Sequence, residues 1–406
     1  MNKLLDNKKI YIIVLVLLTA FALVSLVQGL RNACRDSQDF QWDAAKVLVQ
    51  KINPYDESLM PSGILDKYGY DEYYLQMEAN QFPSLLLILA PFTLLKPLTA
   101  RYVWLILNLI LTLLMIFLLK MTFLKEMETR NFILLMLFML AGTPYRNQIG
   151  VGQHTIFSFC FFLLAVYISE YCELFKRCSE NQKYDKIRFW LIVVCLFICY
   201  FKYTLTVPLV LYFIYKKRYM EIAVSAMAHV LLTVFSAIWL NDSVLNMIIK
   251  PLKVSSALSA EGGLDFGVLL KGSFAANILM FAVMLLLLAL AVKMPDGHSE
   301  ALIAVLILWS LIVIYHRTYD FFVLSAVAGI FFDELFLENK KLYNIFLYAY
   351  YFMLISVFFI LRVFSESVES KMFVGTVYYI FTIAVSVLVF RNYFISKENR
   401  KTKNGK

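Results

Sequence analysis

The chain has 406 residues, of which 61% are hydrophobic and 17% charged, and its formal net charge is +9. A water-soluble globular protein of this length could not bury so much apolar surface, so that class is excluded. The excess of Lys and Arg lies mostly towards the two ends of the chain, which makes anionic lipid the expected counterpart and argues against nucleic acid.

Apolar runs close to the roughly 20 residues that a helix needs to cross a bilayer predict an all-α polytopic membrane protein. The longest runs cover residues 10–30, 100–122, 219–240, 274–292, 342–361 and 372–390. Shorter runs cover residues 131–143, 154–171, 189–201, 204–215, 301–315 and 321–332, and several of them cross only with bilayer thinning or flanking helices. Together these runs predict about twelve transmembrane helices.

Lys and Arg, which are retained on the cytoplasmic side of short loops, set the expected orientation. Basic residues precede the first run and fill the end of the chain, so both termini are expected in the cytoplasm and the number of spans is even. Basic loops at 125–130, 176–188, 216–218 and 340–341 fit this alternation. The layout is one membrane domain with a first extracytoplasmic loop at 31–98, helices at 99–240, a second outer loop at 241–273, C-terminal helices at 274–393 and a cytoplasmic basic tail at 394–406.

The first outer loop begins with three acids, Asp36, Asp39 and Asp43, just past the expected membrane boundary. On a single helix, their spacing of three and then four residues would place all three carboxylates on one face. The stretch from Asp39 to Gln50 has helical character, because one apolar face is supplied by Ala44, Ala45, Val47 and Leu48. A carboxylate at this level is a candidate general base for an acceptor hydroxyl.

Two further elements are expected in the first loop. The sequence Asn53-Pro54-Tyr55-Asp56 predicts a turn, since proline fixes its own φ and Asn or Asp side chains cap such turns. The apolar run at 83–95 hardly exceeds ten residues and is bracketed by prolines, which predicts an interfacial helix on the outer surface instead of a span. The second outer loop is rich in glycine and other small residues around positions 255–267, and we interpret it as a movable lid.

Polar residues at membrane level, all expected on the outer side, complete the candidate site. Ionisable groups at this depth are functional candidates because burying an unpaired charge is costly. Cations at the ends of helices suit an anionic leaving group such as a lipid-linked phosphate that arrives from within the bilayer. The candidate phosphate ligands are Lys202, His316, Arg317 and Arg146, and Gln153 is a candidate for contact with a sugar or with the cavity.

No cofactor is indicated by the sequence. Of the six cysteines only Cys34 is expected on the outer side, so no disulfide framework is predicted. No metal-ligand spacing is present, and a phosphate held by Lys and Arg does not require a metal, although the sequence leaves a divalent ion open.

The order of several short motifs resembles glycosyltransferase family 87, which belongs to the GT-C superfamily of membrane glycosyltransferases and contains polyprenyl-phosphate-mannose-dependent mannosyltransferases. The motifs are Asp39-Phe40-Gln41-Trp42-Asp43-Ala44-Ala45, Asn53-Pro54-Tyr55-Asp56, Gln81-Phe82-Pro83 with Pro91, Gly152-Gln153, Lys202 and Lys217-Arg218. The resemblance covers about the first half of the chain, with little beyond hydropathy after Leu240. Two departures are the single Phe82-Pro83-Ser84 in place of paired prolines, and Asp43 where the family often has an aromatic or other polar residue.

The resemblance implies an inverting transfer of a sugar, with mannose favoured, from a polyprenyl-phosphate donor to a glycan or lipid-linked acceptor at the extracytoplasmic membrane face. It implies that Asp39 is the catalytic base, with Asp43 as a supporting acid. It further implies that Lys202 contacts the donor phosphate and that Gln153 binds a sugar or shapes the cavity.

Simpler structural roles and other functions compete with this interpretation. Asp39 lies one helical turn from Arg35, and Asp43 lies one turn from Lys46, so either acid could form only an ion pair. Lys202 could extend to the interface as lysines at helix ends do, and His316 and Arg317 could form a polar turn with Asp320. A transporter would be expected to show inverted repeats and acids in mid-membrane, and a polysaccharide polymerase or ligase would be expected to have arginine-rich outer loops.

Overall fold

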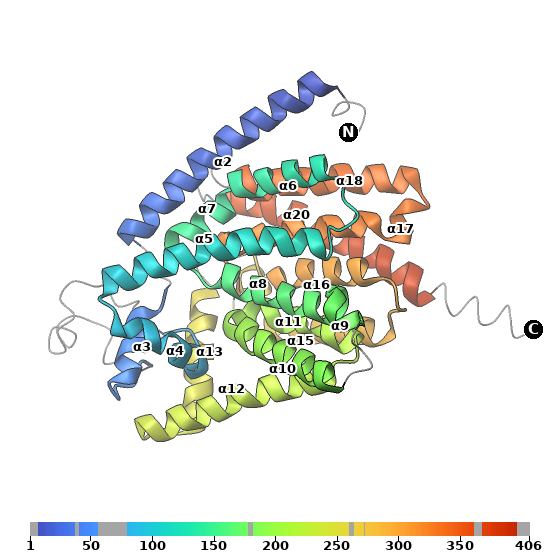
Figure 1. The fold of residues 1–406 in the computed structure, drawn as a ribbon. Coiled ribbons are helices and arrows are strands. Elements are labelled where there is room, and N and C mark those ends of the chain that lie inside the picture. The colour runs from blue at the N-terminus through green and yellow to red at the C-terminus, as the bar shows by residue number, and fades with distance from the viewer. Residues whose placement is uncertain are drawn as a thin grey trace, which may run out of the picture.

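The computed structural model describes residues 7–36, 40–55, 79–177, 182–259, 264–271, 273–360 and 368–395, and every regular element in these ranges is helical (Figure 1). The first half contains α2 Lys8–Asp36, α3 Trp42–Val49, α4 Pro83–Leu89, η3 Ala90–Leu94, α5 Pro97–Met121, α6 Thr129–Ala141, α7 Thr143–Val151, α8 Thr155–Val166, η4 Tyr167–Tyr171, α9 Glu173–Arg177, α10 Gln182–Cys199 and η5 Tyr200–Lys202. The second half contains α11 Tyr203–Tyr215, α12 Tyr219–Leu240, α13 Val244–Ser259, α14 Phe266–Leu269, α15 Phe274–Lys293, α16 Ser299–Val313, η6 Thr318–Phe332, α17 Glu334–Leu337, α18 Lys340–Ile355, η7 Ser356–Ile360, α20 Val368–Phe390 and η8 Arg391–Ile395.

Eight helical segments of the described chain are long and apolar enough to cross a membrane. They are Lys8–Arg35, Pro97–Met121, Thr155–Phe175, Gln182–Tyr215, Tyr219–Leu240, Phe274–Lys293, Lys340–Ile360 and Lys371–Tyr393, and they include all six of the longest apolar runs of the sequence. The runs expected near 131–143, 301–315 and 321–332 form shorter helices, Thr129–Ala141, Ser299–Val313 and Thr318–Phe332. The chain is therefore an all-helical, multi-pass membrane protein, and the total of twelve spans stays a prediction.

The segment from Gln182 to Tyr215 folds back on itself at Lys202. Both of its ends lie at the C-terminal end of the α8 and η4 segment, where Arg188 donates to the Ser169 carbonyl and Lys216 Nζ lies 3.2 Å from Glu170 Oε2. The middle lies at the opposite end, because the Lys202 N–H donates to Ser158 Oγ at 2.9 Å in the first turn of α8. Lys202 itself has φ −101° and ψ 64°, which interrupts the helix. The α10 and α11 helices therefore form a hairpin whose tip is Lys202.

The centre of the bundle is formed by α8, α11 and α16, while α2 and α12 lie at opposite edges (Figure 1). Both α16 and η6 are buried along almost their entire length, which fits their apolar sequence and explains why neither needs a polar face. Close packing is visible at Gly329 of η6, where a Cβ atom would lie 2.6 Å from the carbonyl oxygen of Phe123. This contact fixes the later part of η6 against the segment that follows α5.

The first loop differs from expectation in one respect. The predicted helix is confirmed as α3, and its expected apolar face, Ala44, Ala45, Val47 and Leu48, is buried. However, Asp36 ends α2, Asp43 lies in the first turn of α3, and Gln41 between them has a left-handed φ of 61°. Asp36 and Asp43 therefore lie on two different helices, and the expectation that they share the face of one helix is wrong for this pair. Asp39 itself lies outside the described residues.

The other predicted loop elements can be compared with the structure where their residues are described. Asn53 Oδ1 accepts a 3.0 Å hydrogen bond from the Tyr55 N–H, as expected for an Asn-capped turn. A short helix, α4 followed by η3, occupies the predicted interfacial segment and packs against α3. The expected second outer loop contains the 16-residue helix α13 before its glycine-rich part, and the interpretation of this loop as a movable lid stays a prediction. Its apolar residues before position 255 supply a helical face that the glycines further on do not interrupt.

Candidate active site

A buried ion pair joins the tip of the α10 and α11 hairpin to the start of η6. Lys202 Nζ lies 3.5 Å from Asp320 Oδ2, and the two side chains are 7% and 0% exposed. The other carboxylate oxygen of Asp320 accepts a hydrogen bond from the Thr155 hydroxyl. The carboxylate lies in the first turn of η6, where backbone N–H groups favour negative charge. Burying two charges is costly unless each has such partners. The Thr155 hydroxyl and the start of η6 therefore help to stabilise the buried carboxylate.

Gln153 and Tyr319 extend this polar cluster. Gln153 Nε2 donates to the Tyr319 hydroxyl at 2.8 Å, and the Lys202 ammonium lies 5.2 Å from the centre of the Tyr319 ring. Gln153 follows Gly152, whose left-handed φ of 70° ends α7 and turns the chain into α8. The amide is fixed further because its Oε1 accepts the His154 N–H at 2.9 Å. Two of the predicted site residues, Lys202 and Gln153, are thus brought together through Tyr319.

His316 is the third predicted residue at this cluster. Its Nδ1 lies 2.8 Å from the Ile314 carbonyl oxygen, which can only accept, so Nδ1 carries the proton and Nε2 presents a lone pair. The Nε2 atom is buried without a hydrogen-bond partner among the described residues. Burial lowers the pKa of His316 to about 4, with the Asp320 carboxylate opposing this shift and the Lys202 ammonium adding to it. The imidazole is therefore a neutral acceptor at pH 7, close enough to Lys202 and Asp320 to sense both charges.

His154 is a second buried, neutral imidazole, and it lies beside the first loop. Its Nε2 lies 3.2 Å from the carbonyl oxygen of Phe40, the residue that directly follows Asp39 in the chain. The ring also meets Trp104 edge-on, with 5.3 Å between the ring centres. Burial, followed by the Lys202 charge, lowers the pKa of His154 to about 3. A neutral imidazole thus ties the backbone beside Asp39 to the turn that carries Gln153.

The remaining predicted site residues lie elsewhere. Arg317 follows His316, but its guanidinium lies over the Tyr315 ring and donates to the Tyr315 hydroxyl. Arg146 lies on the side of α7 that faces α2, where Nη1 donates to Gln28 Oε1 at 3.3 Å. Asp43 lies at the start of α3, whose neighbour Lys46 donates to the Thr93 carbonyl at 3.1 Å. The structure therefore supports Lys202, Gln153 and His316 as one cluster and places Arg146 at a different location.

Asp320, Tyr319 and His154 are not among the site residues predicted from the sequence. Asp320 entered only as an ion-pair partner of His316 and Arg317, whereas the structure pairs it with Lys202 from a distant part of the chain. The sequence nevertheless contains an indication of this role, because an acid at the start of a wholly apolar segment requires a buried partner. Lys202 is buried, and its ammonium is paired with Asp320 inside the protein.

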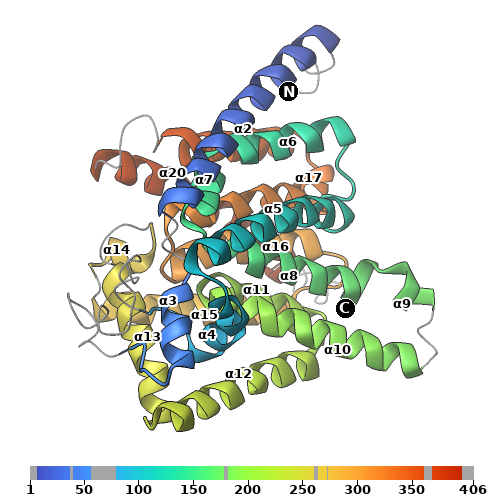
Figure 2. The ribbon, with the colours of Figure 1, turned by 60° about the vertical axis from the view of Figure 1, so that its left-hand side comes forward.

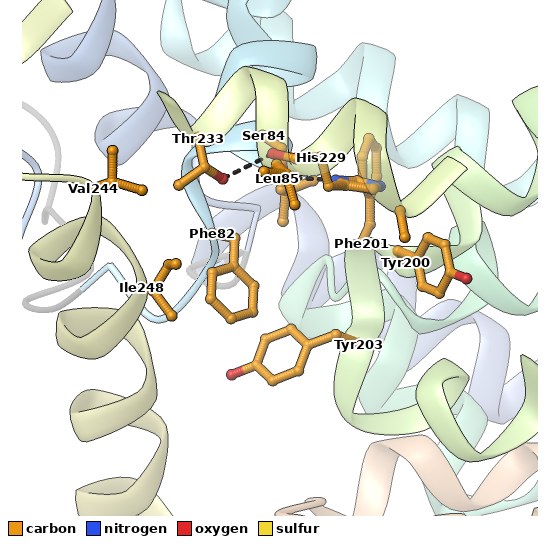
Figure 3. A pocket seen from close by; sticks show the side chains of 12 residues that line it. Phe82, Ser84, Leu85, Tyr200, Phe201, Tyr203, His229, Thr233, Val244 and Ile248 are labelled. Atoms are coloured by element: carbon orange, nitrogen blue, oxygen red, sulfur yellow. Dashed lines mark hydrogen bonds between the residues drawn. The ribbon is translucent and has the colours of Figure 1, made fainter. Parts of the chain in front are cut away.

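An apolar cavity of about 340 Å³ opens beside the hairpin tip, between α4, α12 and α13 (Figure 3). Phe201 and Tyr203, the neighbours of Lys202 on both sides, line this cavity. His229 is fixed at its wall, with Nδ1 2.7 Å from Ser84 Oγ and Nε2 2.7 Å from the Phe197 carbonyl oxygen. Tyr203 also lines a second cavity, of about 410 Å³, which reaches Asp265 and Tyr315. The hairpin tip therefore separates two cavities, one of them almost wholly apolar.

Within the described residues, no three His, Cys, Asp or Glu side chains come together as a metal site. The arrangement instead offers a buried cation, a neutral imidazole acceptor and amide and hydroxyl groups. These groups are suited to hold a phosphate and a sugar next to an apolar chain.

Comparison with known proteins identifies the family. Residues 83–337, more than half of the 406-residue chain, match the family model of glycosyltransferase family 87. No curated protein and no solved structure matches the chain. The matched region contains Lys202, Gln153 and His316 but begins after the acids of the first loop, and it continues well past Leu240, so the expectation that the resemblance ends near that residue is wrong. The chain belongs to glycosyltransferase family 87, a membrane family of the GT-C type, and is a glycosyltransferase.

Proposed function

We propose that this glycosyltransferase transfers a sugar, with mannose favoured, from a polyprenyl-phosphate donor to a glycan or lipid-linked acceptor. The observation that carries the proposal is that the buried Lys202 and Asp320 pair lies at the hairpin tip, where the chain neighbours of Lys202, Phe201 and Tyr203, line an apolar cavity. A polyprenyl-phosphate sugar has the matching chemistry, with an apolar chain joined through one phosphate to a polar sugar. Family membership supports the transferase over a transporter or a polysaccharide polymerase.

In the proposed reaction, the acceptor hydroxyl oxygen attacks the anomeric carbon of the donor sugar and forms the new glycosidic bond. The hydroxyl proton passes to the carboxylate of Asp39, which acts as general base. The bond between the anomeric carbon and the phosphate oxygen breaks, and its electron pair leaves with the polyprenyl phosphate. Because attack and departure occur on opposite faces of the carbon, the anomeric configuration inverts.

The Lys202 ammonium is proposed to stabilise the developing charge on the leaving phosphate. Asp320 already orients this ammonium, so the phosphate shares a preorganised cation and does not have to order a flexible one. In place of the phosphate contact predicted from the sequence, the His316 Nε2 lone pair is proposed to accept a hydrogen bond from a sugar hydroxyl, because a lone pair cannot donate to a phosphate. Gln153 is proposed to contact the sugar or shape its cavity. Asp43 is proposed as a supporting acid beside Asp39, and Arg317 as a more peripheral phosphate contact.

We further propose that the reaction takes place at the extracytoplasmic face of the membrane. Support comes from the basic residues at both chain ends, which are expected in the cytoplasm, and from the hairpin geometry, which places Lys202 at the end of α8 opposite to the basic residues Arg188 and Lys216.

The test is incubation of the purified full chain with a panel of radiolabelled polyprenyl-phosphate sugars and a membrane-glycan acceptor fraction. We expect consumption of one polyprenyl-phosphate sugar, with release of polyprenyl phosphate in step with sugar transfer. A chain that uses only nucleotide sugars, and none of the lipid-linked donors, would overturn the donor assignment while leaving the family assignment intact.

A further inference from the structure

A polar cavity of about 400 Å³ lies where the end of α2 meets α7, away from the Lys202 cluster. It is lined by Gln28, Arg31, Asn32, Arg35 and Arg146, so three guanidinium groups and two amides face it. Among the described residues, no carboxylate lines this cavity. Such a set of donors matches the oxygens of a phosphate group, because guanidinium binds phosphate through paired hydrogen bonds.

The helix crossing holds this set of donors in place. The four α2 residues, at positions 28, 31, 32 and 35, recur at helical spacing and form one stripe of α2, beside the buried face that meets α7. Close approach depends on two glycines, since a Cβ at Gly29 would lie 3.0 Å from the Arg146 carbonyl oxygen and one at Gly150 would lie 3.1 Å from Asn32 Cβ. Figure 2 shows α7 against the end of α2 from a second direction. The guanidinium of Arg146 is further oriented by Asn147 Oδ1, which it meets at 3.0 and 3.2 Å.

The surroundings indicate a ligand that belongs to the membrane. The preceding turns of α2 expose large apolar side chains, with Leu23, Val24 and Val27 exposed by 58%, 50% and 63%. In a membrane protein such a surface faces lipid, so the cavity lies where the lipid-facing part of α2 ends. A headgroup phosphate at this boundary would lie within reach of the arginines while its acyl or prenyl chain follows α2.

We propose that Arg31, Arg35 and Arg146 form a binding site for the phosphate group of a membrane lipid. The site is independent of the Lys202 cluster, because Arg146 lies on the side of α7 that meets α2 and is not part of the hairpin tip. The phosphate has two candidate sources, the headgroup of an anionic phospholipid of the bilayer and the phosphate of a polyprenyl-linked sugar. Both place the same group in the same cavity.

Native mass spectrometry of the purified full chain in neutral detergent tests the proposal, with phosphatidylglycerol, phosphatidylcholine and polyprenyl phosphate added separately. We expect phosphatidylglycerol to be retained over phosphatidylcholine. Arg31→Gln and Arg35→Gln are each expected to lower retention about fivefold, and the double variant by the product, given the strength of cation attraction to anionic lipid. The matched control is Lys96→Gln, which removes an exposed cation before α5, near the same end of α2, without touching the cavity.

The two sources give different results. If polyprenyl phosphate displaces phosphatidylglycerol and the arginine variants raise the KM for the lipid-linked donor, the ligand is a substrate. If phosphatidylglycerol is retained in the presence of polyprenyl phosphate and the KM is unchanged, the ligand is a bilayer lipid. Wild-type retention in the double variant, or equal loss in Lys96→Gln, would overturn the proposal. Arg31→Lys keeps the charge without the paired donors and should retain more binding than Arg31→Gln, and an unchanged unfolding temperature of Arg31→Gln excludes a folding defect.

Discussion

The buried pair of Lys202 and Asp320 provides the most demanding prediction about the structure. Asp320→Asn keeps the side-chain volume and leaves an oxygen that can accept from the Thr155 hydroxyl, but it removes the negative charge beside Lys202. Lys202 is 7% exposed, so water cannot replace the lost partner. Breaking a buried ion pair on one side typically costs about 3 to 5 kcal/mol, because it leaves an uncompensated charge.

The measurement is thermal unfolding of the purified protein in detergent, followed by the loss of helical circular dichroism. We expect the apparent unfolding temperature of Asp320→Asn to fall by several degrees. The combined variant Lys202→Met with Asp320→Leu removes both charges and fills the space with apolar atoms, so we expect it to recover most of the loss.

This reasoning would be refuted by an Asp320→Asn variant that unfolds at the wild-type temperature. It would also be refuted if the combined variant lost as much stability as Lys202→Met and Asp320→Leu lose in sum, because the two charges would then act independently.

Three other predictions follow from the site and its supports. Gly329→Ala places a Cβ 2.6 Å from the Phe123 carbonyl oxygen and should lower stability by about 1 to 3 kcal/mol in the same unfolding assay, whereas Gly375→Ala, with a Cβ at ordinary contact distance, should not. The pKa of His316 is lowered to about 4 by burial, so the unfolded chain binds a proton near pH 6.5 before the folded one does, and the contribution of His316 to stability should be constant above pH 7 and fall between about pH 6.5 and 4. That fall should be smaller in His316→Asn, and an identical pH profile would contradict the assignment. Lys202→Ala should raise the KM for the lipid-linked donor more than the KM for the acceptor, and equal changes would argue against phosphate contact.

Much of the fold followed from local patterns in the sequence. Apolar runs of sufficient length located the long helices, and the spacing of Ala44, Ala45, Val47 and Leu48 located α3 and its buried face. Helical periodicity is a local property and survives burial. The left-handed Gln41 was missed because the break depends on how the chain packs against Trp104 and α4, which lie far away in the sequence.

The sequence predicted several residues of the site but not which of them contact one another. Lys202, His316 and Gln153 were expected from their depth in the membrane and from the family motifs. The contacts of Lys202 with Asp320 and of Gln153 with Tyr319 each join residues more than 100 positions apart. Such pairings depend on helix packing, and so does the separation of Arg146 from the cluster.

The central claim is that this chain transfers a sugar from a polyprenyl-phosphate donor with Asp39 as the base. The most direct test measures sugar transfer from the donor that the wild-type protein consumes, and compares Asp39→Asn in the purified full chain with Asp43→Asn, which removes the proposed supporting acid. We expect Asp39→Asn to abolish transfer while the protein stays folded and inserted, and Asp43→Asn to retain measurable activity. Full activity of Asp39→Asn would remove this carboxylate from the mechanism.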